Sequence, residues 1–288
     1  MFDVDGVLVE TEASYIEAVA RTVQWLLVHD AGLREDGLAV DRSTVREWKL
    51  IGSWNDDWDL SDAMYRWLMA APGATTTQRR RSALPASAAA RMDLEGLRAA
   101  AGERAARTWE EVRGIFEEIY NGSSVAVERY GVTARVHEEH GLAETEHILA
   151  SEELFHALGT LGIKKIAIVT GRSLVDWRAV AKRMPLPPSV AVATMEDGRK
   201  PDPAPLLKVV GELRPRAFFA VGDTRADLEL VRRWNATDEG LRVPGTAVML
   251  CPAEDEPAYR ELGATLFIRS LVELPALLRR ASSPPAIP

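Results

Sequence analysis

From residue 151 onward, short runs of β-branched and apolar residues alternate with stretches of helical periodicity, and this alternation constrains the fold more than any other feature. Strands that alternate with helices form βαβ units on a mostly parallel sheet. Each run is nearly continuous in apolar residues, as expected of strands covered on both faces. The pattern predicts strands at 165–170, 190–194, 217–222, 246–250 and 265–268, with helices after Ser173, Asp202, Arg225, Glu254 and Leu271. The expected fold class is therefore α/β, with a three-layer core.

The stretch from about residue 12 to 149 has helical periodicity and no convincing strand. An apolar stripe predicts its first helix, in which Ser14 and Glu17 have the spacing of a capping box and Gly32 marks the end. Further helices are predicted at 43–50, around Leu60 to Leu68 and around Trp109 to Ile119. Residues 71–91 are rich in Ala, Thr, Ser, Pro and Arg without periodicity, which predicts a mobile surface insertion.

This helical block lies between a very short first strand, Phe2 to Val4, and the rest of the sheet. We therefore predict two domains. Residues 1–12 and 150–288 would form the catalytic core, and residues 13–149 would form an all-helical cap inserted into it. Its place in the chain makes the block a candidate lid.

Composition narrows the class of protein and of partner. The formal net charge of -8 argues against a nucleic-acid or acidic-membrane partner, because binding to a phosphate backbone needs a dominant basic surface. Cys251 is the sole cysteine, so there is neither an internal disulfide nor a Cys-based zinc site. No leader pattern begins the chain, and no run reaches the roughly 18 apolar residues of a membrane span. We expect a soluble, cytoplasmic protein.

Four polar clusters lie at or just beyond the carboxyl ends of predicted strands, where ligands bind in open α/β sheets. They are Asp3-Val4-Asp5-Gly6, Thr170-Gly171-Arg172, Lys200-Pro201-Asp202 and Gly222-Asp223-Thr224-Arg225-Ala226-Asp227. A phosphate monoester dianion repels an anionic nucleophile, so a site that attacks one needs a divalent cation and a fixed positive charge. Asp3 and Asp223 can hold Mg²⁺ through carboxylate oxygens, and Lys200 can supply the charge. The Thr170 hydroxyl and the Gly171 N–H can donate hydrogen bonds to phosphoryl oxygens.

The order D-x-D-G, T-G, K-P and G-D-x-x-x-D resembles the haloacid dehalogenase superfamily, over the core and not over the cap. The resemblance implies a Rossmann-like core with a helical, C1-type cap. It also implies a Mg²⁺-dependent phosphatase that hydrolyses a small phosphate monoester, of a sugar or another hydroxylated metabolite, through an aspartyl-phosphate on Asp3. Dehalogenases of the superfamily lack the second aspartate and phosphonatases replace it, so Asp5 favours phosphate-ester chemistry.

By the same resemblance, Asp5 is the general acid and base, and its backbone carbonyl joins Asp3 at the metal. Asp223 is the metal-binding acid of the fourth motif, and Asp227 is its supporting partner at the metal site. Lys200 is the stabilising lysine. Thr170 is the phosphate ligand, and Gly171 and Arg172 of the same motif are counted with it as phosphate-binding residues.

The first strand departs from the family pattern, because only Met1 and Phe2 precede Asp3 where several apolar residues are usual. Either the true start lies upstream of Met1, which is the explanation we favour, or the sheet is weakened at its middle. Two alternatives to a phosphatase stay open: a phosphomutase acting on a sugar phosphate, and a non-catalytic binding relative. The expected partner is a small phosphorylated metabolite, and the protein would be a monomer or a homodimer.

The segment 49–58 concentrates aromatic and polar residues in the cap. Its side chains could face the core, where Trp54 would stack on the substrate and Asn55 would bind its hydroxyls. Alternatively the tryptophans fill the interior of the cap and Asp56 or Asp57 caps a helix. The sequence leaves both readings open.

Overall fold

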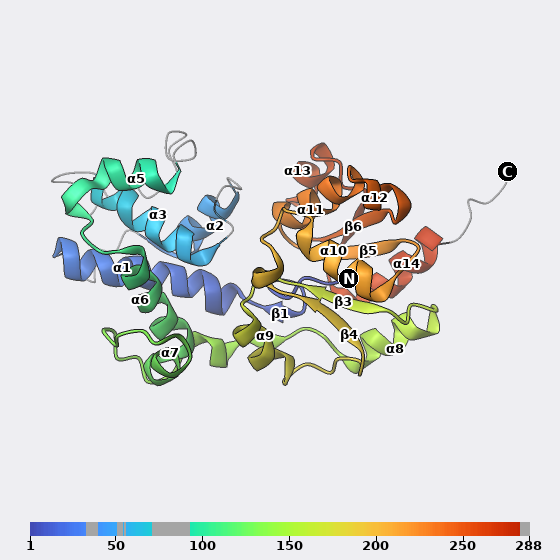
Figure 1. Cartoon of the computed structure of the whole chain (residues 1–288), viewed down its shortest axis with the longest axis horizontal. Coiled ribbons are helices and arrows are strands. Elements are labelled where there is room, and N and C mark those ends of the chain that lie inside the picture. Colours follow the sequence, from blue (N-terminus) through green and yellow to red (C-terminus); the bar gives the residue numbers. More distant parts are fainter. Residues whose placement is uncertain (33–39, 51–53, 55, 71–92, 283–288) are drawn as a thin grey trace. The chain divides into compact units, whose positions relative to one another are not determined.

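The computed structural model of the chain describes residues 1–32, 40–50, 54, 56–70 and 93–282. It contains two compact units (Figure 1). The core unit joins Met1–Glu10 to His147–Pro288, and the helical unit is Thr11–Glu146. The predicted mobile insertion, 71–91, lies outside the described residues.

The strands of the main sheet of the core unit run parallel, as the sequence predicted. β3 (Ile166–Val169) pairs with β4 (Val190–Ala193). A second group consists of β5 (Phe218–Gly222), β6 (Gly245–Leu250) and β7 (Leu266–Ile268), with β6 in the middle. All five predicted strands are present, because each is an apolar run short enough to be read without ambiguity.

Phe2 connects these two groups of strands. It forms parallel bridges to Ile168 of β3 on one side and to Val221 of β5 on the other. Its N–H donates to the Ala167 carbonyl and its own carbonyl accepts from the Val169 N–H, both at 2.9 Å. The predicted first strand is thus reduced to a bridge around Phe2, but it occupies the centre of the order β4, β3, Phe2, β5, β6, β7.

Helices cover both faces of this sheet, as the alternation of residues along β3 shows. Ile166 and Ile168 share an apolar cluster with α8 (Glu152–Thr160), α9 (Leu174–Ala181) and α14 (Leu274–Ser282). Ala167 and Val169 share another with α10 (Ala204–Leu213) and α11 (Arg225–Asn235). The other core helices are α12 (Asp238–Arg242), α13 (Glu256–Glu261), η6 (Met195–Asp197) and η7 (Leu271–Glu273). The core is a three-layer, Rossmann-like α/β fold, which confirms the predicted fold class.

The helical unit supplies the predicted cap domain of the fold. It consists of η1 (Glu12–Ile16), α1 (Glu17–Ala31), α2 (Arg42–Leu50), α3 (Asp57–Ala70), α5 (Leu94–Ala101), η4 (Gly102–Arg104), α6 (Trp109–Asn121), α7 (Ser123–Tyr130) and η5 (Leu142–Thr145) (Figure 1). Its core is rich in aromatic side chains, including the fully buried Trp48, Tyr65 and Phe116. No helix in the described part of the chain is long and apolar enough to cross a bilayer.

One local expectation is corrected at the start of the helical unit. Ser14 and Glu17 do not form a capping box, because the chain enters through the π-helical turn η1, whose N-cap is Thr11. The Ser14 hydroxyl is instead 3.1 Å from Glu146 Oε1, as its hydrogen-bond donor. Gly32 does end α1, at φ 62°.

The second correction concerns the join between the two units. β1 (Val9–Glu10) pairs antiparallel with β2 (His147–Ile148), and Glu10 lies opposite His147. No strand was expected in the stretch containing β2. A two-residue strand is too short to leave a periodic signal.

Candidate active site

Asp3 lies at the carboxyl end of the short central bridge and is held there by the backbone. Its N–H donates to the Val221 carbonyl at 2.9 Å. Its carboxylate accepts a hydrogen bond from the Val4 N–H at 2.8 Å, and the residue is only 8% exposed. The chain then turns back on itself, with the N–H groups of Leu8 and Val9 both donating to the Val4 carbonyl. A turn this tight fixes the direction of the Asp3 side chain.

Gly6 of the D-x-D-G motif is required by two independent features of this turn. Its φ is +71°, a conformation that costs little only for glycine. A Cβ at Gly6 would also lie 1.9 Å from Asp223 Oδ2. The absence of a side chain therefore lets the Asp223 carboxylate lie against the loop that carries Asp3 and Asp5.

Lys200 brings a positive charge to the nucleophile candidate. Its Nζ lies 2.7 Å from Asp3 Oδ1 and 2.6 Å from Asp227 Oδ1, and its side chain is 5% exposed. The Lys200–Pro201 peptide bond is cis. Burial lowers the pKa of Lys200, but the carboxylates of Asp227 and Asp3 raise it by more. The pKa of Lys200 is therefore above its ordinary value. The lysine is therefore a fixed cation between two carboxylates.

Asp223 and Asp227 follow β5 at the same edge of the sheet. Asp227 forms a capping box with Thr224 at the start of α11, where the Thr224 hydroxyl donates to Asp227 Oδ2 at 2.6 Å. Both oxygens of Asp227 are thus engaged, one by Thr224 and one by Lys200. Asp3, Asp223 and Asp227 each offer a carboxylate oxygen within 4.8 Å of the others.

The charges of this cluster fit a divalent cation. One ammonium faces three carboxylates, so the site carries surplus negative charge. Burial raises the pKa of Asp3 to about 7 against the opposing charge of Lys200, and the neighbouring carboxylates of Asp227 and Asp5 add to the rise. Carboxylate oxygens are the ligands that Mg²⁺ prefers. Asp3 and Asp223 are suited to hold the ion, and Asp227 is suited to hold Lys200.

The second motif meets the first through its arginine. The Nε and one terminal nitrogen of Arg172 both donate to Asp5 Oδ1, at 2.9 and 2.7 Å. Thr170 is buried, and its hydroxyl oxygen accepts from the Arg172 N–H at 3.1 Å. Gly171 between them is exposed, with nothing within 4 Å of the position of a Cβ. The Thr170-Gly171-Arg172 turn is therefore anchored at both ends and open in the middle.

These contacts bring together most of the residues that the sequence singled out. Direct contacts join Asp3, Lys200 and Asp227, and another joins Asp5 to Arg172. Trp54 belongs to the helical unit, where it is 7% exposed and its ring centroid lies 6.4 Å from that of Trp48.

The same segment also supplies a helix cap, because Asp56 accepts from the N–H groups of Trp58 and Asp59 at the start of α3. Trp54 thus packs inside the helical unit and Asp56 caps a helix. Asn55 lies outside the described residues. The assignment of Trp54 and Asn55 to substrate binding stays a prediction.

Tyr259 of α13 is a site neighbour that sequence reasoning missed. Its hydroxyl donates to the backbone carbonyl of Asp223 at 2.8 Å. Burial raises the pKa of Tyr259, and the carboxylates of Asp223 and Asp227 add to the rise, so the phenol keeps its proton and remains a donor. A tyrosine that binds a backbone carbonyl leaves no motif in the sequence.

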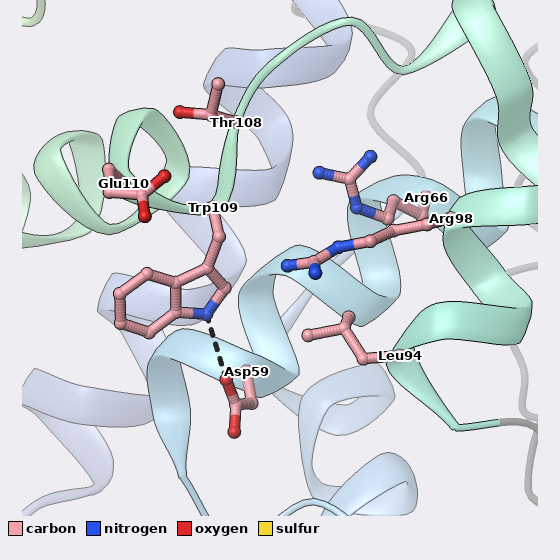
Figure 2. Close-up of a pocket in the computed structure, with 7 residues that line it drawn as sticks. All are labelled: Asp59, Arg66, Leu94, Arg98, Thr108, Trp109 and Glu110. Carbon is pink, nitrogen blue, oxygen red and sulfur yellow. Dashed lines mark hydrogen bonds between the residues drawn. The ribbon is translucent and has the colours of Figure 1, made fainter.

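A cavity of about 630 Å³ lies within the helical unit. It is lined by Asp59, Arg66, Leu94, Arg98, Thr108, Trp109 and Glu110 (Figure 2). The Trp109 indole N–H donates to Asp59 Oδ1 at 2.9 Å, and Arg66 and Arg98 point into the space from the other side (Figure 2). Arg66 Nε lies 2.8 Å from Asp62 Oδ1, and its terminal nitrogens donate to two backbone carbonyls. These contacts belong to the framework of the unit, and no predicted site residue lines the cavity.

Comparison with known proteins places this site in a family. The family model for haloacid dehalogenase-like hydrolases matches residues 1–233. The solved structure of phosphatase Tt82 from Thermococcus thioreducens matches with a TM-score of 0.61 and 24% identity, over 86% of this chain and 90% of that one. A protein from Lactobacillus delbrueckii subsp. bulgaricus, provisionally assigned as a phosphoglycolate phosphatase, matches with a TM-score of 0.52 and 16% identity, over 95% of each chain. At these identities the two structures share the fold. No curated protein sequence matches the chain at a significant level.

Proposed function

The chain belongs to the haloacid dehalogenase-like hydrolases, and from that premise we propose that it is a Mg²⁺-dependent phosphatase of small organic phosphate monoesters. The observation that carries the proposal is the buried Asp3 carboxylate, 2.7 Å from the Lys200 ammonium and next to Asp223. A carboxylate so placed can attack a dianionic ester, because the repulsion between the two anions is compensated. The two solved neighbours are both described as phosphatases, which supports ester hydrolysis.

The proposed first step transfers the phosphoryl group to Asp3. An Asp3 carboxylate oxygen forms a bond to phosphorus while the bond from phosphorus to the ester oxygen breaks. Asp5 gives its proton to the departing alkoxide. In the second step Asp5 takes a proton from water, whose oxygen attacks the phosphorus of the aspartyl-phosphate, and inorganic phosphate leaves as Asp3 is restored.

The other residues of the cluster bind and orient. Asp3, Asp223 and the backbone carbonyl of Asp5 would hold Mg²⁺, which supplies compensation for the charge of the ester when bound. The Lys200 ammonium, which Asp227 holds in place, would also compensate the negative charge of the ester. The Thr170 hydroxyl and the Gly171 N–H would donate to phosphoryl oxygens, in a turn that is open at Gly171.

We also propose that the helical unit acts as a cap that excludes water from the reacting groups and selects the substrate. A hydroxylated metabolite phosphate, of a sugar or a related compound, is the proposed substrate, and the proposed location is the cytoplasm. Trp54 and Asn55 are the candidate contacts to its hydroxyls.

The proposal is tested by measuring phosphate release from a panel of phosphorylated metabolites with and without Mg²⁺. We expect Asp3→Asn to abolish both phosphate release and labelling of the protein from a radiolabelled phosphate ester. Asp5→Asn should still be labelled by an aryl phosphate, but should lose the label slowly. Rapid turnover by Asp3→Asn would rule out covalent catalysis at this residue, and transfer of the phosphoryl group to a second sugar hydroxyl would identify a mutase.

A further inference from the structure

Arg172 and Asp5 form a close ion pair that the proposed mechanism does not yet use. They are 167 residues apart in sequence. Two nitrogens of the guanidinium donate to the same oxygen, Asp5 Oδ1, at 2.9 and 2.7 Å. The arginine side chain is 2% exposed, whereas that of Asp5 is 30% exposed. A buried, two-point donor therefore holds a carboxylate that is itself partly exposed.

Hydrogen bonds also hold the backbone of Arg172 in place. Its N–H donates to Thr170 Oγ1 at 3.1 Å, and its carbonyl accepts from the Met195 N–H at 3.1 Å. The next residue, Ser173, is the N-cap of α9 and accepts from the Asp176 N–H. The backbone position of Arg172 is thus fixed, and the burial of its side chain limits the directions in which the guanidinium can point.

The two oxygens of Asp5 are left with different surroundings. Oδ1 receives both hydrogen bonds from Arg172, and among the described residues Oδ2 has no hydrogen-bond partner. A protonated carboxyl carries its hydrogen on one oxygen and accepts through the other. A guanidinium donates only and does not give up its proton in a protein, so it cannot compete for the proton of Asp5.

We propose that Arg172 is a positioning residue. By occupying Oδ1 of Asp5, it leaves Oδ2 as the oxygen through which Asp5 exchanges its proton with the substrate. The inference rests on the proposed function. In the first step the proton passes from Asp5 Oδ2 to the ester oxygen as the bond from that oxygen to phosphorus breaks. In the second step the proton of the attacking water returns to Oδ2. Arg172 donates to Oδ1 throughout and remains a cation.

This role differs from phosphate binding, which the motif of Arg172 suggested from sequence. A phosphate-binding arginine would improve the transfer of every phosphate ester, whatever group leaves. A residue that orients the general acid matters most where the leaving group is a strong base that needs a proton. The two roles therefore predict different dependence on the leaving group.

The test compares 4-nitrophenyl phosphate with benzyl phosphate, which are of similar size but release a phenolate and an alkoxide. Steady-state kcat and KM are measured with Mg²⁺ for the wild type, Arg172→Gln and Arg172→Lys. The matched control is Arg178→Gln, which alters an exposed arginine on α9. Circular dichroism and thermal unfolding establish that each variant is folded.

We expect Arg172→Gln to lose about 10- to 100-fold in kcat/KM on benzyl phosphate, with a much smaller loss on 4-nitrophenyl phosphate and little change in KM. Arg172→Lys should recover part of the loss, since an ammonium can still donate to Oδ1. Arg178→Gln should match the wild type on both esters.

Equal losses on both esters, or a raised KM on both, would overturn the positioning role while leaving the phosphatase proposal intact. If Arg172→Gln does not fold, Arg172→Lys decides the test. A loss of kcat/KM confined to benzyl phosphate in that variant supports the inference, and an equal loss on both esters contradicts it. A wild type that releases phosphate from neither ester nor from any metabolite of the panel would remove both proposals.

Discussion

Lys200 Nζ lies between Asp3 and Asp227, 2.7 Å from Oδ1 of the first and 2.6 Å from Oδ1 of the second. All three side chains are nearly buried, so each charge depends on the others rather than on water. The helix that begins at Arg225 holds Asp227, and the central bridge holds Asp3. The lysine therefore connects two elements of the core as well as serving the site.

Lys200→Met is expected to destabilise the protein by about 3–5 kcal/mol, because it leaves two buried carboxylates without their cation. It should also lower kcat by at least about 100-fold, as a fixed charge at the reacting group is lost. Denaturant unfolding and phosphatase assays measure the two effects. Lys208→Met is the control: its pair with Asp197 is at the surface, with the lysine 46% exposed, and should be worth at most about 1 kcal/mol. Similar losses in both variants would contradict the buried role of Lys200.

Stability without metal should depend on the protonation of Asp3. Burial raises the pKa of Asp3 from 3.8 to about 7, so the folded state binds this proton more tightly than the unfolded state does. This contribution to stability is fully present below about pH 4 and is lost as the pH rises through about 7. The rise in Tm produced by Mg²⁺ should therefore be larger above pH 7 than below it, since protons and the cation compete for one carboxylate. Thermal unfolding with EDTA and with Mg²⁺ measures this difference, and Asp3→Asn should abolish it.

Gly6→Ala should damage the metal site more than the fold. The new Cβ would meet Asp223 Oδ2 at 1.9 Å, at a φ of +71° that costs alanine about 1–2 kcal/mol. We expect weaker Mg²⁺ binding by calorimetry and a large loss of activity, with this moderate loss of stability. Gly159→Ala in α8 is the matched control, because nothing lies within 4 Å of its Cβ position. That variant should be stabilised by roughly 0.5–1 kcal/mol and keep full activity.

In the helical unit, Nε and a terminal nitrogen of Arg107 donate hydrogen bonds to the Asp30 carboxylate at 2.8–3.1 Å. The Tyr65 hydroxyl donates to the same carboxylate at 2.7 Å. Burial opposes ionisation of Asp30, but these donors hold its pKa below the ordinary value. The stabilisation is therefore present above about pH 4 and is lost as the pH falls through the lower folded pKa.

Arg107→Met should accordingly cost about 1 kcal/mol at neutral pH and progressively less in acid. Urea unfolding at a series of pH values measures the difference. Asp30→Asn is the control, since Arg107→Met should cost much less in that background. A cost that is independent of pH would mean that Arg107 acts by packing against Trp25, 5.8 Å from its ring centroid, rather than by charge.

The sequence predicted the sheet and the order of the polar motifs, because each strand is a short apolar run and the four polar clusters follow one another at or just beyond strand ends. It could not predict which side chains form contacts with one another. Motifs singled out Asp5 and Arg172 separately, but nothing in either motif shows that the two side chains pair across 167 residues. Tyr259, which donates to the backbone carbonyl of Asp223, belongs to no motif at all.

Local signals failed where tertiary contacts override them. Ser14 has the spacing of a capping residue, yet its hydroxyl binds Glu146, at the far end of the helical unit. Tyr120 of α6 donates to the same oxygen of Glu146 at 2.8 Å, so this carboxylate links both ends of the unit to α6. Hydrogen bonds from these two hydroxyls to a buried carboxylate contribute more free energy than the hydrogen bond of a helix cap would.

The pairing of β1 with β2 has a consequence for how this architecture can vary. Glu10 and His147 lie opposite each other in this two-stranded ladder, so the chain leaves the core unit and re-enters it at neighbouring points. A segment spliced in at such a place can lengthen, shorten or be replaced by an unrelated one while every strand keeps its register. Because Thr11–Glu146 forms a compact unit of its own, a short turn joining Glu10 to His147 would be the minimal form of the same topology.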